Sequence, residues 1–196
     1  MKQNKMNLPN RLTLARIAAV PVFLILLLWQ FPFHYFAALV IFVVASLTDL
    51  FDGRIARSRG LITDFGKFLD PIADKMLTTA ALLGFISLGI GFGTVWITVI
   101  VLIREFSVSS IRMIAAASGK VVAADKWGKI KTVMQMVGII MALTFEEFIS
   151  LFPSLLLVGT ILRIAYNIVL WFSAVLTVVS GINYLVKNKT FVDPNK

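Results

Sequence analysis

The sequence contains no cysteine and only one histidine, His34. Without cysteine, disulfide bonds and thiolate metal sites are excluded. Charged residues are also few, at 15% of the 196 residues, whereas a soluble domain typically has about 25%. The hydrophobic content is 59% and the mean hydropathy is +0.90. This apolar surface exceeds what one soluble core of this length would bury, so the composition favours a protein whose solvent is lipid.

Acidic residues are scarcer than basic ones, with 10 Asp and Glu against 19 Lys and Arg and a formal net charge of +9. In a soluble protein this balance would suggest nucleic acid as a partner. In a membrane protein it reflects basic cytoplasmic loops and anionic lipid. We therefore expect membrane lipids and no nucleic acid as partners. The basic N-terminus precedes an apolar run without a small-residue cleavage pattern, which indicates an uncleaved first membrane helix.

Six stretches approach the roughly 20 apolar residues that a membrane-spanning helix needs. They cover about residues 12–31, 34–57, 66–89, 94–117, 124–144 and 154–187. Connections that carry no Lys or Arg alternate with connections that are rich in them. This alternation predicts an all-α, polytopic membrane protein with six transmembrane helices and both termini in the cytoplasm. No internal repeat is visible, and residues 1–196 are expected to form a single membrane domain.

Four aspartates lie beside this apolar background at helical spacings: Asp49, Asp52, Asp70 and Asp74. Asp49 and Asp52 share one helical stripe, and Asp70 and Asp74 are one turn apart. Clustered carboxylates repel one another unless cations neutralise them, and all-oxygen ligands favour Mg²⁺ or Mn²⁺. Two metals bridged by carboxylates form a clamp for a phosphoryl centre. The alternative, solvated acids at an interfacial turn, suits any single aspartate better than all four.

The complete pattern from Asp49 to Asp74 is D-x2-D-G-x2-A-R-x8-G-x3-D-x3-D. It resembles the signature of the CDP-alcohol phosphotransferase family, integral membrane enzymes that transfer a phosphate ester from a CDP-linked donor to an alcohol and release CMP. The resemblance implies two divalent metal ions, Mg²⁺ or Mn²⁺, held by the four aspartates. Asp74 would also be the general base for the acceptor hydroxyl. Residues implied at the CDP-linked donor are Asn10, Thr13, Gly53, Ala56, Arg57 and Gly66.

The choice of acceptor must come from residues outside the aspartate pattern. Arg104 and Arg112 lie eight positions apart on about the same face of the fourth stretch, and arginine at membrane depth is a functional candidate. A lysine group follows at the start of the fifth stretch. Cations that converge near the metals would suit an acceptor with its own phosphate. The residues predicted to bind that phosphate are Arg104, Arg112, Lys129 and Lys131, whereas Lys126 is expected only to mark the cytoplasmic interface.

Three further acids and one arginine are not assigned a catalytic role by the sequence. Glu105 is expected to pair with an arginine or a lysine. Glu146 and Glu147 are expected in a solvated outer loop, and Arg163 has no obvious partner within the sixth stretch.

Three segments outside the aspartates, NLPNRLTLAR, REFSVSSIR and GKIKTVMQM, resemble the branch of the family that makes phosphatidylglycerophosphate. The chain departs from that branch at Ser109 and Ser110, where related sequences read Thr-Gly. The resemblance implies transfer of the phosphatidyl group from CDP-diacylglycerol to glycerol 3-phosphate. It also implies a homodimer in a bacterial inner membrane, with the active site facing the cytoplasm.

Two alternatives stay open. The first is the same chemistry with another acceptor, namely phosphatidylglycerol, inositol phosphate or serine. The second is a cation transporter, although transport sites usually lie near the bilayer midplane.

Overall fold

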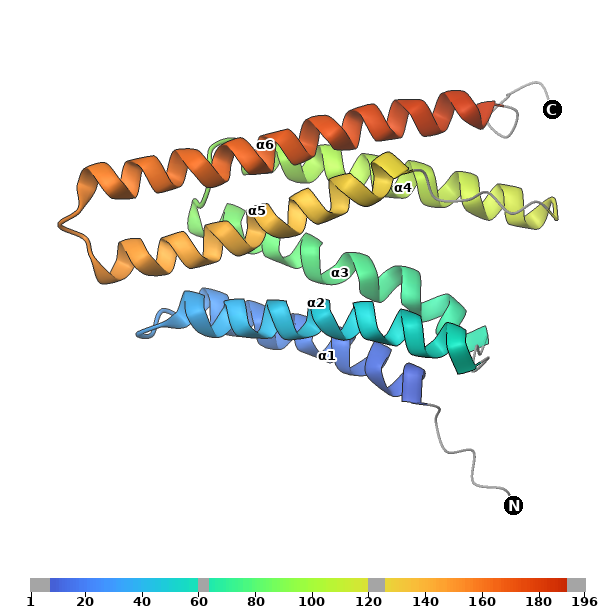
Figure 1. Ribbon diagram of the computed structural model, residues 1–196, viewed down its shortest axis with the longest axis horizontal. Coiled ribbons are helices and arrows are strands. Elements are labelled where there is room, and N and C mark those ends of the chain that lie inside the picture. Colours follow the sequence, from blue (N-terminus) through green and yellow to red (C-terminus); the bar gives the residue numbers. More distant parts are fainter. Residues whose placement is uncertain (1–7, 60–63, 120–125, 190–196) are drawn as a thin grey trace, which may run out of the picture.

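The computed structural model describes the backbone of residues 8–59, 64–119 and 126–189, and the side chains of residues 12–48, 72–73, 75–119 and 127–189. The described chain forms six α-helices and no strand. They are α1 (Leu8–Leu28), α2 (His34–Arg59), α3 (Asp64–Leu88), α4 (Thr94–Ala117), α5 (Lys126–Leu151) and α6 (Leu156–Lys187). The helices run alternately toward one end of the bundle and then the other (Figure 1). The predicted all-α class is thus confirmed, and each of the six predicted stretches corresponds to one helix.

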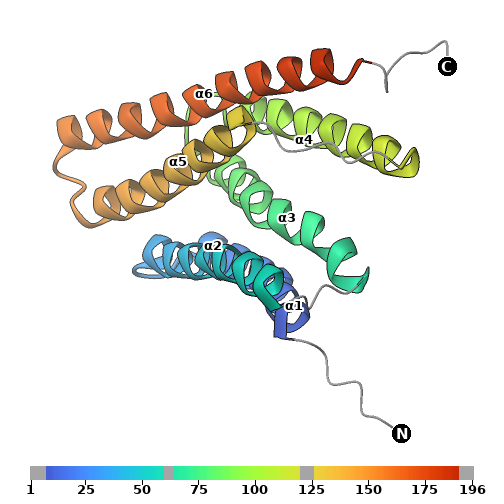
Figure 2. The ribbon, with the colours of Figure 1, turned by 45° about the vertical axis from the view of Figure 1, so that its right-hand side comes forward.

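The helices form two groups joined by α3. Helix α1 packs against α2 and α3, whereas α5 and α6 form the most extensive helix pair. Figure 2 shows α3 running from the α1–α2 pair toward α4, α5 and α6. Helix α2 also reaches α5, and α4 packs on α6. The beginning of α1, the end of α2, the beginning of α3 and the end of α4 therefore lie toward the same end of the molecule (Figure 1).

The core lies where these helices meet, and it is made of aromatic and branched side chains. Phe23, Phe42 and Phe85, from three different helices, are completely buried. Between α5 and α6 the helix axes approach closely at Gly138, where an added Cβ would lie 2.8 Å from Cδ2 of Leu170. Small residues at helix contacts are typical of membrane bundles, in which lipid tails are as apolar as leucine and close packing must hold the helices together.

Many large hydrophobic side chains are exposed on the outer surface of the bundle. On α6 alone Leu156, Leu157 and Ile168 are 78%, 75% and 63% exposed, and large contiguous apolar patches on a protein indicate a lipid or protein partner. Within the described residues, α4, α6 and the segment Trp127–Leu151 of α5 are long and apolar enough to cross a bilayer. Helices α1 to α3 contain shorter apolar segments. The protein is therefore a membrane protein with at least three candidate spans.

The helix bounds differ from the sequence prediction mainly in α5. Helix α4 begins and ends where predicted, after the turn at Gly93, whose φ of +69° suits glycine. Helix α5 continues seven residues beyond the predicted end at Thr144 and reaches Leu151. Glu146 and Glu147 are therefore helical and buried, at 6% and 7% exposure, and the prediction of a solvated loop is wrong.

Candidate functional site

A cavity of about 480 Å³ lies among α1, α2, α3, α4 and α5. Its described lining includes six cationic side chains and one carboxylate, that of Glu105. The cations are Arg16, Lys75, Arg104, Arg112, Lys129 and Lys131. Two of the helices that form it, α2 and α3, also carry the aspartate pattern. A cavity with this excess of positive charge can bind an anion.

Glu105 is the centre of the ionic network in this cavity. Its Oε1 accepts hydrogen bonds from Lys131 and from Nη1 of Arg104, the latter at 3.0 Å. Its Oε2 lies 3.2 Å from Nζ of Lys75, and Lys75 also donates to the hydroxyl of Ser109. The predicted pairing of Glu105 with an arginine or a lysine is thus confirmed. One carboxylate thus forms ion pairs with three cations, which come from α3, α4 and α5.

Arg104 crosses from α4 to the interface of α5 and α6. Its Nη2 donates to Oγ of Ser180 at 2.9 Å, and Ser180 is completely buried. A Cβ added at Gly128 would lie 3.0 Å from that same Nη2, and one added at Gly181 would lie 3.1 Å from Cγ of Arg104. The two glycines therefore leave the space through which the arginine passes. Its Nε is buried and has no hydrogen-bond partner among the described residues.

Arg112 also depends on α6. Its Nε donates to the hydroxyl of Tyr184 at 3.3 Å, and its guanidinium lies 5.7 Å from the centroid of the Tyr184 ring. Tyr184 is almost fully buried, at 2% exposure. The hydrogen bond and the ring contact together fix the direction of an arginine that otherwise has a mobile side chain. Helix α6 thus positions both predicted phosphate-binding arginines.

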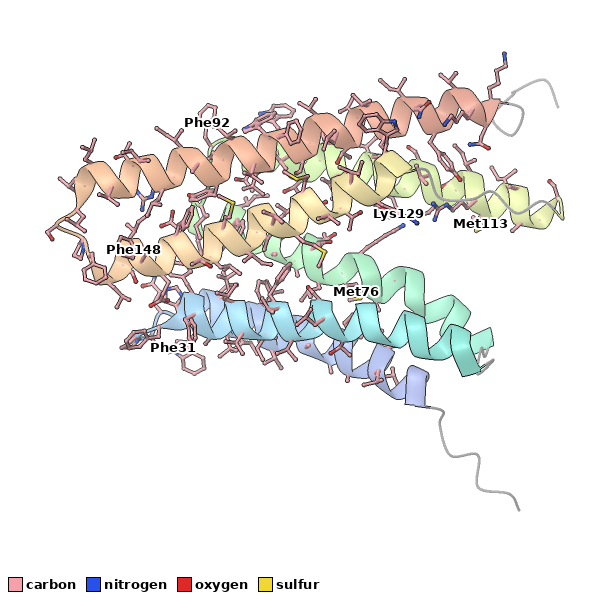
Figure 3. All side chains as sticks on the ribbon, viewed as in Figure 1. Phe31, Met76, Phe92, Met113, Lys129 and Phe148 are labelled. Carbon is pink, nitrogen blue, oxygen red and sulfur yellow. The ribbon has the colours of Figure 1, made fainter. Side chains whose placement is uncertain are left out.

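The two predicted lysines of α5 occupy different environments. Lys131 is buried at 4% exposure and is bound to Glu105, whereas Lys129 is exposed and lines the cavity. Figure 3 shows Lys129 in the half of the bundle that contains Met113, away from Phe31 and Phe148. The structure therefore brings the four predicted phosphate-binding residues to one cavity. The side chain of Lys126 is outside the described residues.

For the four aspartates the structure describes the backbone and not the side chains. Asp49 and Asp52 belong to α2, and Asp70 and Asp74 belong to α3. Their side chains, and those of Asn10, Gly53, Ala56, Arg57 and Gly66, lie outside the described residues. The described cavity lining nevertheless includes Ser46, one turn before Asp49, and Lys75, directly after Asp74. The cavity therefore adjoins the aspartate segments along both helices.

No group of three or more potential His, Asp or Glu ligands occurs among the side chains that are described, so the predicted metal site rests on the aspartate pattern. Thr13, the one predicted donor-binding residue with a described side chain, is buried at 3% exposure. It is three positions before the cavity residue Arg16, on the same face of α1. This place in the fold is compatible with the predicted role and does not test it.

Sequence reasoning missed five residues of this site. Arg16 and Lys75 could have been predicted from the sequence. Arg16 follows the predicted Thr13 by one turn, and Lys75 follows Asp74 directly. Gln135 lies one turn after Lys131 and is buried at 3% exposure. Its amide nitrogen has no partner in the described structure. Ser180 and Tyr184 are more than 70 positions from the arginines that they bind, so no local pattern pointed to them.

A second ionic network lies at the opposite end of α5. Glu146 accepts both guanidinium bonds of Arg163, each at 3.1 Å, and the hydroxyl of Tyr166 at 2.8 Å. Glu147 accepts the backbone N–H of Phe36 at 2.9 Å, in the first turn of α2. Arg163 therefore has a partner, which the sequence analysis could not assign. Both glutamates are buried because helices far apart in the sequence supply donors to them.

Comparison with known proteins identifies the family. Residues 6–179 match the family model described as CDP-alcohol phosphatidyltransferase. A Bacillus subtilis protein named CDP-diacylglycerol–glycerol-3-phosphate 3-phosphatidyltransferase is 38% identical over 93% of this chain and 95% of its own length. A Rickettsia bellii protein of the same name is 35% identical over 94% of this chain and 97% of its own. A Mycobacterium tuberculosis protein named probable phosphatidylglycerophosphate synthase is 39% identical over 92% of this chain and 81% of its own. The chain belongs to the CDP-alcohol phosphatidyltransferase family and is an enzyme of that class.

Proposed function

We propose that this member of the family transfers the phosphatidyl group of CDP-diacylglycerol to glycerol 3-phosphate, giving phosphatidylglycerophosphate and CMP. The observation that carries the proposal is the basic cavity beside the two aspartate segments. The names of its relatives agree with this choice of donor and acceptor. A cavity without this cation excess would suit a neutral acceptor such as serine equally well.

The phosphate of the acceptor accounts for the charges of the cavity. A phosphate dianion can accept several charge-assisted hydrogen bonds, and arginine can bind it through two parallel N–H groups. Two buried donors of the cavity lining, Nε of Arg104 and the amide nitrogen of Gln135, have no partner among the described residues. Buried donors without partners are costly, and a bound anion would satisfy them. Arg104, Arg112, Lys129 and Lys131 are the proposed phosphate ligands.

The aspartates would hold the metal ions. Asp49, Asp52, Asp70 and Asp74 provide only carboxylate oxygens, a donor set that fits two Mg²⁺ or Mn²⁺ ions. When bound, these ions would neutralise charge on the diphosphate of the donor and on the departing CMP. Asn10, Thr13, Gly53, Ala56, Arg57 and Gly66 would shape the nucleotide site at the adjoining ends of α1, α2 and α3.

The reaction itself needs one base and one correctly placed hydroxyl. Asp74 would take the proton of the acceptor's terminal hydroxyl, whose oxygen then forms a bond to the β-phosphorus of CDP-diacylglycerol. The bond from that phosphorus to the bridging oxygen breaks, and CMP leaves with the electron pair. Phosphate binding in the basic cavity would orient the hydroxyl toward the aspartate segments, because the cavity adjoins them along α2 and α3. Holding the two reactants in this way supplies much of the rate enhancement.

The proposed placement in the membrane follows the charge distribution. All six helices would span the bilayer, with both termini and the aspartate end of the bundle in the cytoplasm, in a bacterial inner membrane. The protein would act as a homodimer. Donor acyl chains would stay in lipid while the water-soluble acceptor enters from the cytoplasm. A cysteine placed near the aspartate end, such as Ser118→Cys, should react with an impermeant thiol reagent only when the cytoplasmic face is accessible.

The decisive assay is CMP release by detergent-purified protein supplied with CDP-diacylglycerol and Mg²⁺. Glycerol 3-phosphate, inositol phosphate, serine and phosphatidylglycerol are offered separately. We expect release with glycerol 3-phosphate only, and loss of that release with EDTA. Release with a different alcohol would retain the donor chemistry and contradict the proposed acceptor. Release that is unaffected by EDTA would contradict the metal requirement.

A further inference from the structure

We propose that Glu105 is a built-in counter-anion of the acceptor site, which the phosphate of the acceptor displaces from its cations when it binds. This inference rests on the proposed function, because it assigns a role to a carboxylate inside the proposed phosphate site. It makes Glu105 a specificity-determining residue that sets how tightly the site binds any phosphate. Neither metal binding nor proton transfer is assigned to it.

The contacts of Glu105 are those of an anion in an anion site. Both of its oxygens are occupied: Oε1 by Lys131 and Arg104, and Oε2 by Lys75. The side chain is only 14% exposed, so these ion pairs are weakly screened by solvent. Three cations on one carboxylate is also the arrangement that a protein offers to a phosphate group. Glu105 therefore pairs with these three cations in the way that a bound anion would.

The charge balance explains why such a carboxylate is needed. Six cationic side chains line the described part of the cavity, and Lys75, Arg104 and Lys131 all converge on the Glu105 carboxylate. Without an anion they would repel one another at membrane depth, where unpaired charge is expensive. Glu105 holds them together in the absence of substrate. It also opposes the entry of a second anion, because like charges in a poorly screened cavity repel.

Two of the three cations can be released from Glu105 without losing their positions. Arg104 keeps its bond to Ser180 and its place beside Gly128, and Lys75 keeps its bond to Ser109. Each of these two cations thus has a neutral second partner. That partner would hold the side chain in place when its ion pair with Glu105 is replaced by one with the phosphate. Glu105 thus lowers the affinity of the site for phosphate, while Ser180 and Ser109 also maintain its geometry.

A functional consequence follows for selectivity. An acceptor site that bound any phosphate tightly would be occupied by inorganic phosphate, which shares the dianion with glycerol 3-phosphate. With Glu105 present, the phosphate group alone binds weakly, and only an acceptor that also offers a hydroxyl to the reaction centre gains enough to bind. Removing the carboxylate should therefore strengthen anion binding. If Glu105 only held the cations in place, its replacement would instead weaken anion binding.

The test is isothermal titration calorimetry of the full-length protein in detergent and EDTA, with inorganic phosphate and with glycerol 3-phosphate as probes. Glu105→Gln keeps the shape of the side chain and removes its charge. We expect it to bind inorganic phosphate about tenfold more tightly than the wild type, from the loss of one nearby like charge. The apparent KM for glycerol 3-phosphate should fall as well. Glu105→Asp, which keeps the charge, should bind phosphate within about twofold of the wild type.

Two further variants keep the test decisive. Lys75→Gln removes one of the mutually repelling cations, so adding Glu105→Gln in that background guards against a failure to fold, and it should again tighten phosphate binding. Glu146→Gln removes a buried carboxylate far from the cavity and should leave phosphate affinity unchanged. Equal or weaker phosphate binding by the Glu105→Gln variants would overturn the role of Glu105 alone. Failure of both the wild type and Glu105→Gln to bind either probe would overturn the proposed acceptor site as well.

Discussion

The two ends of the bundle both bury glutamates in ionic networks, but with opposite charge balance. At the far end, Glu146 takes both guanidinium bonds of Arg163 and the hydroxyl of Tyr166. In the cavity, Glu105 is shared by three cations, and Arg104 retains a buried donor without a partner among the described residues. At the far end no described buried donor lacks a partner, and the unbonded buried atom is an acceptor, Oε1 of Glu147. Such a network joins helices together and offers no donor to an anion. A network with donors left over can bind a ligand, and this difference distinguishes the structural end of the bundle from the functional one.

The largest effect is expected at the aspartates that adjoin the cavity. Asp74→Asn removes the proposed base and a metal ligand together, so turnover should fall by about 10³-fold or more. Asp70→Asn should have a comparable effect through metal binding. CMP release measures both. The variants should keep the elution volume and the melting temperature of the wild type in EDTA, because the packing of the helices is unchanged. Activity within tenfold of the wild type would contradict these roles.

Arg104 should be the next most sensitive position. Arg104→Ala removes the charge-assisted bonds proposed for the phosphate, each worth about 1.5–3 kcal/mol. We expect the apparent KM for glycerol 3-phosphate to rise by about 10- to 100-fold, with little change in the KM for CDP-diacylglycerol. Steady-state kinetics with each substrate varied in turn separates the two. An equal rise in both constants would indicate that the arginine maintains the fold rather than the acceptor site.

The matched change at the structural end is Glu146→Gln. It breaks the paired hydrogen bonds with Arg163, whose side chain is 56% exposed, so solvent moderates the cost. We expect a loss of about 1–2 kcal/mol in the free energy of unfolding, seen as a lower melting temperature in detergent. The KM for glycerol 3-phosphate should stay within about twofold of the wild type. A large KM change from this end would remove the distinction between the two networks.

The smallest effect is expected from the glycine beside Arg104. Gly128→Ala brings a Cβ to 3.0 Å from Nη2 of Arg104, so the guanidinium must shift by a few tenths of an ångström. A misplacement of this size should raise the KM for glycerol 3-phosphate several-fold, by about 1 kcal/mol of lost binding. Gly159→Ala is the matched helical control, because its Cβ would meet Ile149 at an ordinary 3.5 Å. Identical kinetics for the two variants would show that Arg104 does not need its present position.

Local pattern predicted the helices well because apolar length and turn residues are local properties. Helix α4 shows this, since the glycine turn before Thr94 and the Ser118-Gly119 end bound it on both sides. The error in α5 has a physical cause: Glu146 and Glu147 suggest a loop unless their partners are known. Those partners are Arg163, 17 positions later, and the N–H of Phe36, 111 positions earlier. Tertiary hydrogen bonds thus overrode the polarity of the sequence.

The candidate site, like the helices, was predictable only where local properties of the sequence determine it. Arg104 and Arg112 stand out as charges at membrane depth. Lys129 and Lys131 stand out as a basic group at the start of the fifth stretch, and the fold brings all four residues to one cavity. Their supports, Ser180 and Tyr184, are common residues of an apolar helix, and nothing in the sequence distinguishes them from their neighbours. The roles of the four aspartates remain predictions, because they depend on side chains outside the described residues.

The central claim is that the cavity recognises the phosphate of the acceptor. The most direct measurement compares CMP release with glycerol 3-phosphate and with glycerol, which offers the same primary hydroxyl without the phosphate. The account predicts release with glycerol 3-phosphate and at least about 10²-fold less with glycerol at equal concentration, because two or more charge-assisted hydrogen bonds are absent. Equal rates with the two alcohols would contradict it.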